Sequence, residues 1–275
     1  MAEGVLAVVD EWGPDTVAIG VTDADATLDT HGPCAQVLAL ASVTKPLTAY
    51  ATLIAVQDGA LHLDEPVDDP HLDDAVTVRH LLAHASGLPF EDDAPVQAPE
   101  RRRVYSNWGF ELLGALVAER VGSPFAEHLE VEVLAPLGMG DTSLDGSPAA
   151  DATGTVDDLL RFTRELLRPR LLGGELFAEA VSTQFPGLDG ILPGFGRQRP
   201  NDWGLGFELK DAKEPHWTGT SLSPATFGHF GRAGSFLWVD PQAGIGCAEL
   251  ASSPFGAWAK RGWPPLADAV IGRYT

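Results

Sequence analysis

The hydrophobic and polar positions of this 275-residue chain follow strand-like patterns near both ends and helix-like patterns between them. Residues 5–10 and 16–22 are rich in β-branched and apolar residues, and Gly13 and Pro14 lie in the short segment between them. This arrangement predicts two strands joined as a hairpin. A further apolar run, residues 36–40, leads directly into a helical pattern.

That helical pattern begins at Ser42 and continues to about Asp58, and Gly59 is placed to cap its C-terminus. Residues 62–74 are acidic and contain two prolines, so we expect a loop there. More helical patterns follow, separated by segments that contain glycine or proline, at residues 77–84, 107–121, 124–135 and 155–168.

Strand patterns return in the last third of the chain, at residues 204–209, 227–230, 235–240 and 245–251, and a closing helix is expected at 259–272. We therefore expect an α+β fold of the α/β-sandwich type. Its antiparallel sheet would combine the N- and C-terminal segments, residues 1–60 and 200–275, and would be flanked by helices. Residues 61–199 would form an inserted, mainly helical region, with a ligand cleft between the two parts.

Composition excludes several partners. The chain has 39 Asp and Glu against 18 Lys and Arg, a net charge of −21, so its surface repels phosphate backbones and anionic membranes. We therefore expect no nucleic-acid or membrane partner. The two cysteines, Cys34 and Cys247, are too few for a disulfide framework, and whether they are neighbours stays open. No signal peptide or transmembrane pattern is visible, which indicates a cytoplasmic protein.

Ser42-Val43-Thr44-Lys45 is a Ser-x-x-Lys motif at the start of the first helical pattern. Residues three apart lie on one face of a helix. A serine hydroxyl needs a base to become a good nucleophile, and a lysine can be that base only when burial or a nearby cation keeps it neutral. Taken alone, the motif is equally compatible with a capping serine beside an exposed lysine.

Three more segments accompany this motif: residues 80–88, then Tyr105-Ser106-Asn107 before a helix, and His229-Phe230-Gly231 in a late strand. In this order the set resembles the serine β-lactamase and penicillin-binding-protein superfamily. The closest branch is the class C β-lactamase-like group, which includes esterases and D-amino-acid-specific peptidases. Residues 58–67 and 203–207 add to the resemblance, which covers most of the chain and implies a β-lactamase/transpeptidase-like fold.

The resemblance implies a role for each matched residue. Ser42 would be the acylated nucleophile, and Lys45 would relay its proton. Tyr105 would be the partner base, with its phenolate favoured by the positive charge of the lysine. Asn107 would hydrogen-bond to the substrate and to Lys45. His229 would help to hold Tyr105 and the substrate.

The resemblance also implies an oxyanion hole made of the backbone N–H groups of Ser42 and of Arg232, directly after Gly231. The third motif departs from the Lys-Thr-Gly of true β-lactamases, and its histidine is common among esterase-like and peptidase-like members. This departure disfavours strong penicillin hydrolysis. Arg232 is unusual at its position; it could bind a substrate carboxylate, although a surface arginine paired with an acid is the preferred interpretation.

The function expected from these features is a serine hydrolase that forms an acyl-enzyme on small carboxylic esters, with D-amino-acid amides or peptides as the next choice. No metal and no cofactor would be needed. One alternative is a β-lactamase, D,D-peptidase or D-aminopeptidase. Another is a non-catalytic binding protein that retains the fold. The sequence leaves the physiological substrate, its stereochemistry and the oligomeric state open.

Other features receive simpler interpretations. His80 and His84 lack the glutamate of a His-Glu-x-x-His site, so we expect packing at a helix end rather than metal binding. The acidic loop lacks the Ca²⁺-loop spacing. Residues 101–103, three arginines, would offset the acidic surface rather than contact an anionic substrate. No Gly-x-Ser-x-Gly elbow exists, which argues against an α/β-hydrolase. Whether Trp108 and Trp203 line the pocket or belong to the core stays open.

Overall fold

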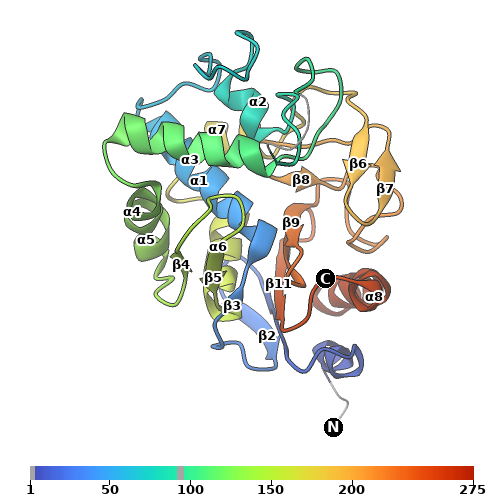
Figure 1. Cartoon of the computed structure of the whole chain (residues 1–275). Coiled ribbons are helices and arrows are strands. Elements are labelled where there is room, and N and C mark those ends of the chain that lie inside the picture. Colours follow the sequence, from blue (N-terminus) through green and yellow to red (C-terminus); the bar gives the residue numbers. More distant parts are fainter. Residues whose placement is uncertain (1–3, 92–95) are drawn as a thin grey trace.

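A six-stranded antiparallel sheet organises the computed structural model, which describes residues 4–91 and 96–275 (Figure 1). The strand order is β2-β1-β11-β10-β9-β8. Their bounds are β1 (Val17–Thr22), β2 (Thr27–His31), β8 (Glu208–Leu209), β9 (Phe227–Gly231), β10 (Ser235–Asp240) and β11 (Ile245–Ala251). Because β1 pairs with β11, the two ends of the chain share one sheet, as predicted.

Helices cover both faces of this sheet. On one face, α6 (Val156–Leu167) packs against β1, β10 and β11. Its approach is so close that a Cβ on Gly20 of β1 would contact the side chains of Leu160 and Val156. On the other face, α8 (Ala257–Tyr274) and η1 (Val5–Glu11) bury a second apolar cluster. In Figure 1 these covering layers lie on opposite sides of β11. The α+β sandwich class expected from the sequence is therefore confirmed.

The middle of the chain forms the helical layer around α1 (Thr44–Gln57), which is buried along nearly its whole length. The helix α1 packs against α3 and α4, and its first turn is buried inside the molecule. The remaining helices are α2 (Val78–Leu82), α3 (Asn107–Val121), α4 (Phe125–Leu129), the π-helical η3 (Glu130–Leu134), α5 (Ala135–Leu137) and α7 (Gly174–Ala180).

Short elements complete the fold. The 3₁₀ turn η2 (Ala41–Val43) precedes α1, and β6 (Gly190–Leu192) and β7 (Gly196–Gln198) form a separate hairpin. A small sheet joins β3 (Leu38–Ala39), β4 (Ser143–Leu144) and β5 (Ala152–Gly154). Across the described ranges, no helix is long and apolar enough to cross a membrane.

One predicted strand is wrong, and a second is correct only in part. Residues 5–10 form the 3₁₀-helix η1 instead of a strand, and the hairpin partner of β1 is β2. The buried Leu6 and Val9 lie three residues apart, which is the period of a 3₁₀-helix, although β-branched residues surround them. Of residues 204–209, only Glu208–Leu209 pair as a strand. The division into regions 1–60 with 200–275 and 61–199 stays a prediction.

Candidate active site

Ser42 lies in the η2 turn, which is pressed against the end of β9. A Cβ on Gly231 would lie 2.6 Å from the carbonyl oxygen of Leu40 and would also collide with the side chain of Ser235. The Ser235 hydroxyl donates a hydrogen bond to the same carbonyl, at 2.6 Å. Ala41, just before the serine, has a φ of 46°, which few non-glycine residues adopt. The turn that carries Ser42 is thus fixed by the strand beside it.

Lys45 is completely buried one turn further along the chain. Its Nζ donates hydrogen bonds to Asn107 Oδ1 at 2.5 Å and to the carbonyl oxygen of Ala149 at 3.0 Å. Burial lowers the pKa of Lys45 to about 7. A neutral amine has two N–H groups, and these two acceptors can engage both of them. The nitrogen lone pair then remains available to accept a proton.

Tyr105 is the closest aromatic neighbour of this amine, with its ring centroid 4.6 Å from Lys45 Nζ. Burial raises the pKa of Tyr105 well above its usual range, while the Ser42 side chain acts in the opposite direction. Its hydroxyl oxygen is buried and forms no hydrogen bond of normal geometry with the described residues. At neutral pH the side chain is therefore a phenol, and the phenolate expected from the resemblance is not its resting form.

Four aromatic side chains surround the Tyr105 ring: His84, Phe90, Trp203 and His229, with centroids 4.7, 5.9, 5.8 and 5.7 Å away. The Ser106 backbone N–H donates to Nδ1 of His84 at 3.2 Å, so the neutral ring carries its proton on Nε2. Burial lowers the pKa of His84 well below its usual value. These neutral rings hold Tyr105 in an apolar setting.

His80 and His84 do not share a site. His80 accepts a hydrogen bond from the Thr77 N–H at the start of α2, and its Nε2 lies 3.2 Å from Glu100 Oε1. The expected packing role at the helix end therefore applies to His80. His84 is a contact residue of Tyr105 that sequence reasoning missed, although it lies within residues 80–88, one of the segments that carried the resemblance.

His229, on β9, is also neutral. Its Nδ1 lies 2.7 Å from the carbonyl oxygen of Phe230, and because a carbonyl can only accept, Nδ1 carries the proton. Burial, together with the nearby Lys45, lowers the pKa of His229 to about 3. Its Nε2 thus presents a lone pair and no positive charge, unlike the lysine of a Lys-Thr-Gly motif.

A cavity of about 200 Å³ opens beside Ser42, Tyr105 and His229. The rest of its lining is mainly apolar and comprises Phe90, Leu192, Pro193, Gly194, Trp203, Glu208, Phe230, Arg232 and Phe255. Trp203 therefore lines the pocket, whereas the ring of Trp108 packs against His71, 5.3 Å away. Such a lining favours small apolar groups next to the serine.

Arg232 is exposed at the rim of this cavity. Its side chain forms no ion pair with any residue in the described part of the chain, so the pairing preferred from the sequence is not found there. Its backbone carbonyl accepts a hydrogen bond from the Phe255 N–H at 2.9 Å. The side chain can therefore turn toward a ligand that carries an anionic group.

Behind the cavity lies a buried ionic cluster that no sequence motif signalled. The Glu208 carboxylate accepts hydrogen bonds from Lys213 Nζ, from His216 Nε2 at 2.8 Å and from Trp217 Nε1 at 2.8 Å. Although burial opposes it, the neighbouring His216 and Lys213 lower the pKa of Glu208 to about 2. The cluster fixes the β8 edge of the pocket, since Glu208 belongs to the lining.

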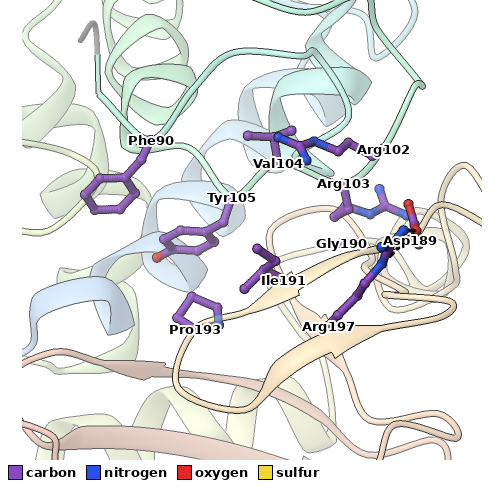
Figure 2. Close-up of a pocket in the computed structure, with 10 residues that line it drawn as sticks. All are labelled: Phe90, Arg102, Arg103, Val104, Tyr105, Asp189, Gly190, Ile191, Pro193 and Arg197. Atoms are coloured by element: carbon purple, nitrogen blue, oxygen red, sulfur yellow. Dashed lines mark hydrogen bonds and ion pairs between the residues drawn. The ribbon is translucent and has the colours of Figure 1, made fainter. Parts of the chain in front are cut away.

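A second hollow, of about 480 Å³, continues from the first and shares Phe90, Tyr105 and Pro193 with it. Figure 2 shows that its two ends differ: Phe90, Tyr105 and Pro193 form an apolar end, and Arg102, Arg103, Asp189 and Arg197 gather at the other. The two hollows adjoin at these three shared residues and together make up the cleft, with Ser42 in the first hollow and the charged end in the second.

Comparison with known proteins shows the family to which this chain belongs. Residues 7–270 match the Beta-lactamase family, so the chain belongs to this family of serine hydrolases, and the resemblance seen in the sequence is confirmed. A solved β-lactamase from Mycobacterium bovis is 48% identical, with a TM-score of 0.95 over 99% of this chain and all of its own. The esterase EstB of Burkholderia gladioli is 25% identical over 85% of this chain and 82% of its own length.

Other relatives carry other names. A D-alanyl-D-alanine-carboxypeptidase/endopeptidase, AmpH of Escherichia coli K12, is 26% identical over 41% of this chain and 38% of its own length. The solved hydrolase EstCE1, with acyltransferase activity, is 18% identical with a TM-score of 0.80, covering 98% of this chain and 96% of its own, and shows the shared fold.

Proposed function

We propose that this protein is a class C β-lactamase-like serine hydrolase that cleaves small carboxylic esters through an acyl-enzyme on Ser42. One observation carries the proposal: Lys45, three residues after Ser42, is fully buried with its pKa lowered to about 7, between Asn107 and Tyr105. A buried lysine that is neutral near pH 7 is a base for a serine hydroxyl.

The chemistry follows from these positions. Ser42 Oγ attacks the ester carbonyl carbon, and its proton passes to the Lys45–Tyr105 pair, where the neutral amine is the member able to accept it. The tetrahedral intermediate then expels the alcohol, which takes a proton from the same pair. Water attacks the acyl carbon and gives one proton to the pair; the bond to Ser42 Oγ then breaks, the pair returns that proton to Oγ, and the carboxylic acid leaves.

The remaining residues support the developing charge. The backbone N–H groups of Ser42 and Arg232 would form the oxyanion hole, and the close contact of Gly231 with the turn before Ser42 supports this assignment. Asn107 accepts a hydrogen bond from the Lys45 amine and donates one to Glu91 Oε1 at 3.0 Å, so its contact with the substrate stays an expectation from the resemblance. His229 offers a neutral Nε2 to the phenol of Tyr105 or to the substrate.

Two features favour esters over β-lactams. The cavity beside Ser42 is small and mostly apolar, and His229 brings no positive charge where β-lactamases have a lysine. A second candidate function, as a β-lactamase, D,D-peptidase or D-aminopeptidase, is favoured by Arg232, because an exposed guanidinium can bind the carboxylate of such substrates. Turnover of a chromogenic cephalosporin against short-chain nitrophenyl esters separates the two functions.

The test is the mass of the intact protein after reaction with a fluorophosphonate. Wild type and Ser123→Ala, a control on an unrelated turn, should each gain one adduct, and Ser42→Ala should gain none. An adduct on Ser42→Ala would place the nucleophile elsewhere. An unmodified wild type would favour the remaining alternative, a binding protein that retains the fold.

A further inference from the structure

The charged end of the cleft is built where two distant segments run side by side. The Arg103 N–H donates to the carbonyl oxygen of Asp189 at 2.8 Å, and Arg103 forms a parallel bridge with Gly190 at the start of the β6–β7 hairpin. This pairing brings Arg102 into one hollow with Asp189 and Arg197 (Figure 2). Tyr105 lies only two residues beyond Arg103 on the same segment.

The three consecutive arginines at residues 101–103 have different surroundings. The sequence predicts that all three only offset the acidic surface. Arg101 is exposed and is not part of the lining. Arg103 is buried, and its guanidinium donates to backbone carbonyls, including those of Ala83 and Gln184, so it holds segments together. Arg102 is exposed, lines the hollow and forms no ion pair within residues 4–91 and 96–275.

Positive charge at this end exceeds negative charge among the lining residues. Asp189 is the acid of the lining; it pairs with Arg197, and its carboxylate oxygen lies 3.7 Å from Arg199 Nε. Hydrogen bonding from Arg197, with the nearby Arg199 and Arg102, lowers the pKa of Asp189. One carboxylate thus faces several guanidinium groups in a chain whose net charge is −21. Such a local reversal of charge attracts anions.

From this geometry, and resting on the proposed function, we propose that Arg102 and Arg197 bind an acidic group on the substrate. The substrate class is then an ester or amide that carries a carboxylate or phosphate at a distance from the bond that is cleaved. A guanidinium fork matches both oxyanions in shape and charge. Since the two hollows share Phe90, Tyr105 and Pro193, one ligand can reach from Ser42 to the arginines.

The kinetic test compares nitrophenyl half-esters of dicarboxylic acids, from glutarate to suberate, with their uncharged methyl-ester counterparts. A second pair, butyrate esters of 4-hydroxybenzoate and of phenol, carries the acid on the leaving group and shows which side of the bond lies in the hollow. We expect kcat/KM to favour the acid in at least one pair by about ten-fold at low salt. Added salt should reduce the preference, because exposed charges are screened.

Variants that are expected to change the preference for the acidic substrate in opposite directions make the test strict. Arg102→Gln should lower the preference for the acid about ten-fold, and Arg197→Gln at least as much because it also releases Asp189. Asp189→Asn should raise the preference, which damage to the fold would not do. Arg261→Gln, an exposed arginine of α8, should leave the preference at its wild-type value. Equal preference in all these proteins would overturn the inference.

A binding measurement separates this inference from the proposed function. Calorimetry of Ser42→Ala with adipate and with phenyl phosphate should show binding that Arg102→Gln weakens and Asp189→Asn strengthens. If the protein hydrolyses esters but none of these charge changes has an effect, the anion site is contradicted and the proposed hydrolase function is retained. If the protein binds the anions but is not labelled by a fluorophosphonate, the anion site is supported and the proposed hydrolase function is contradicted.

Discussion

Lys45 shows how burial fits an ordinary side chain for the role of base that we propose for it. An exposed lysine is almost fully protonated at neutral pH, and only loss of hydration brings its pKa to about 7. The neighbouring acceptors, Asn107 Oδ1 and the Ala149 carbonyl, then hold the amine in one orientation. The reactivity assigned to Ser42 depends on this one position.

This dependence predicts the pH profile of the proposed ester hydrolysis. Because the amine must be neutral, kcat/KM should fall about ten-fold per pH unit below about 7 and level off above it. His229, with a pKa of about 3, adds no step in that range, so His229→Gln should keep the same inflection. Lys45→Arg should lose activity by about a thousand-fold or more. A rate independent of pH between 5 and 7 would contradict the assignment of Lys45.

Glu249 is another buried titratable group, on β11 beneath α8. Trp263 Nε1 donates to its Oε1 at 3.0 Å, and Oε2 has no partner in the part of the chain that the structure describes. Burial raises the pKa of Glu249 well above 4.5. The unfolded chain therefore releases a proton that the folded protein keeps, and this carboxyl costs stability as the pH rises above about 4.5.

Replacing Glu249 with glutamine should remove that cost. We expect Glu249→Gln to raise the free energy of unfolding by about 1–3 kcal/mol at pH 8 and by less at pH 5. Urea denaturation at both pH values measures the difference. Glu119→Gln, an exposed change on α3, should have no such pH dependence. An equal effect of Glu249→Gln at both pH values would show that the carboxyl is ionised in the folded state.

Among the elements, the contact between β9 and the η2 turn positions Ser42, the nucleophile that we propose. Adding a methyl group at Gly231 would push against the Leu40 carbonyl and the Ser235 side chain. We expect Gly231→Ala to lower kcat/KM by about a hundred-fold, because small displacements of catalytic groups are costly. Gly174→Ala on α7, where a Cβ would meet no atom within 4 Å, should retain wild-type kinetics. Unchanged kinetics in Gly231→Ala would show that the contact does not position Ser42.

The sequence predicts most of these elements because periodicity is a local property. The patterns for α1, α3, α6 and the strands β9 to β11 agree with the structure within a few residues. The strand predicted at residues 5–10 is wrong because a short apolar run fits a strand and a 3₁₀ turn equally well. Of the strand predicted at residues 204–209, only Glu208 and Leu209 pair, because only these two residues lie beside β9.

The site was predictable only as far as its motifs extend. The motifs led to the expected hydrogen bond between Lys45 and Asn107, which are 62 positions apart, and the structure contains it. The setting of His84, the Glu208 cluster and the arginine end of the cleft arise from packing between segments that share no pattern. The resting phenol of Tyr105 is likewise a consequence of burial, which the motif does not encode.

At the scale of the whole molecule, the net charge of −21 sets how the protein responds to salt. Mutual repulsion of acidic groups opposes the compact state, and mobile ions screen it. We expect the melting temperature to rise between 0.05 and about 0.5 M NaCl, by roughly several degrees. Sucrose of equal osmolality controls for general solute effects. A melting temperature that falls with salt would mean that ion pairs such as Arg79–Asp64 outweigh the repulsion.

The strand order also governs when the protein can become active during its synthesis. On the ribosome, β1 and the turn of Ser42 emerge early, but β1 must wait for β11, and that turn must wait for β9 and β10. An emerging chain of 200 residues therefore already carries the serine, the lysine and the tyrosine without the strands that set them in place. Nascent chains held at that length should not react with a fluorophosphonate, and reactivity should begin only after β11 has left the exit tunnel.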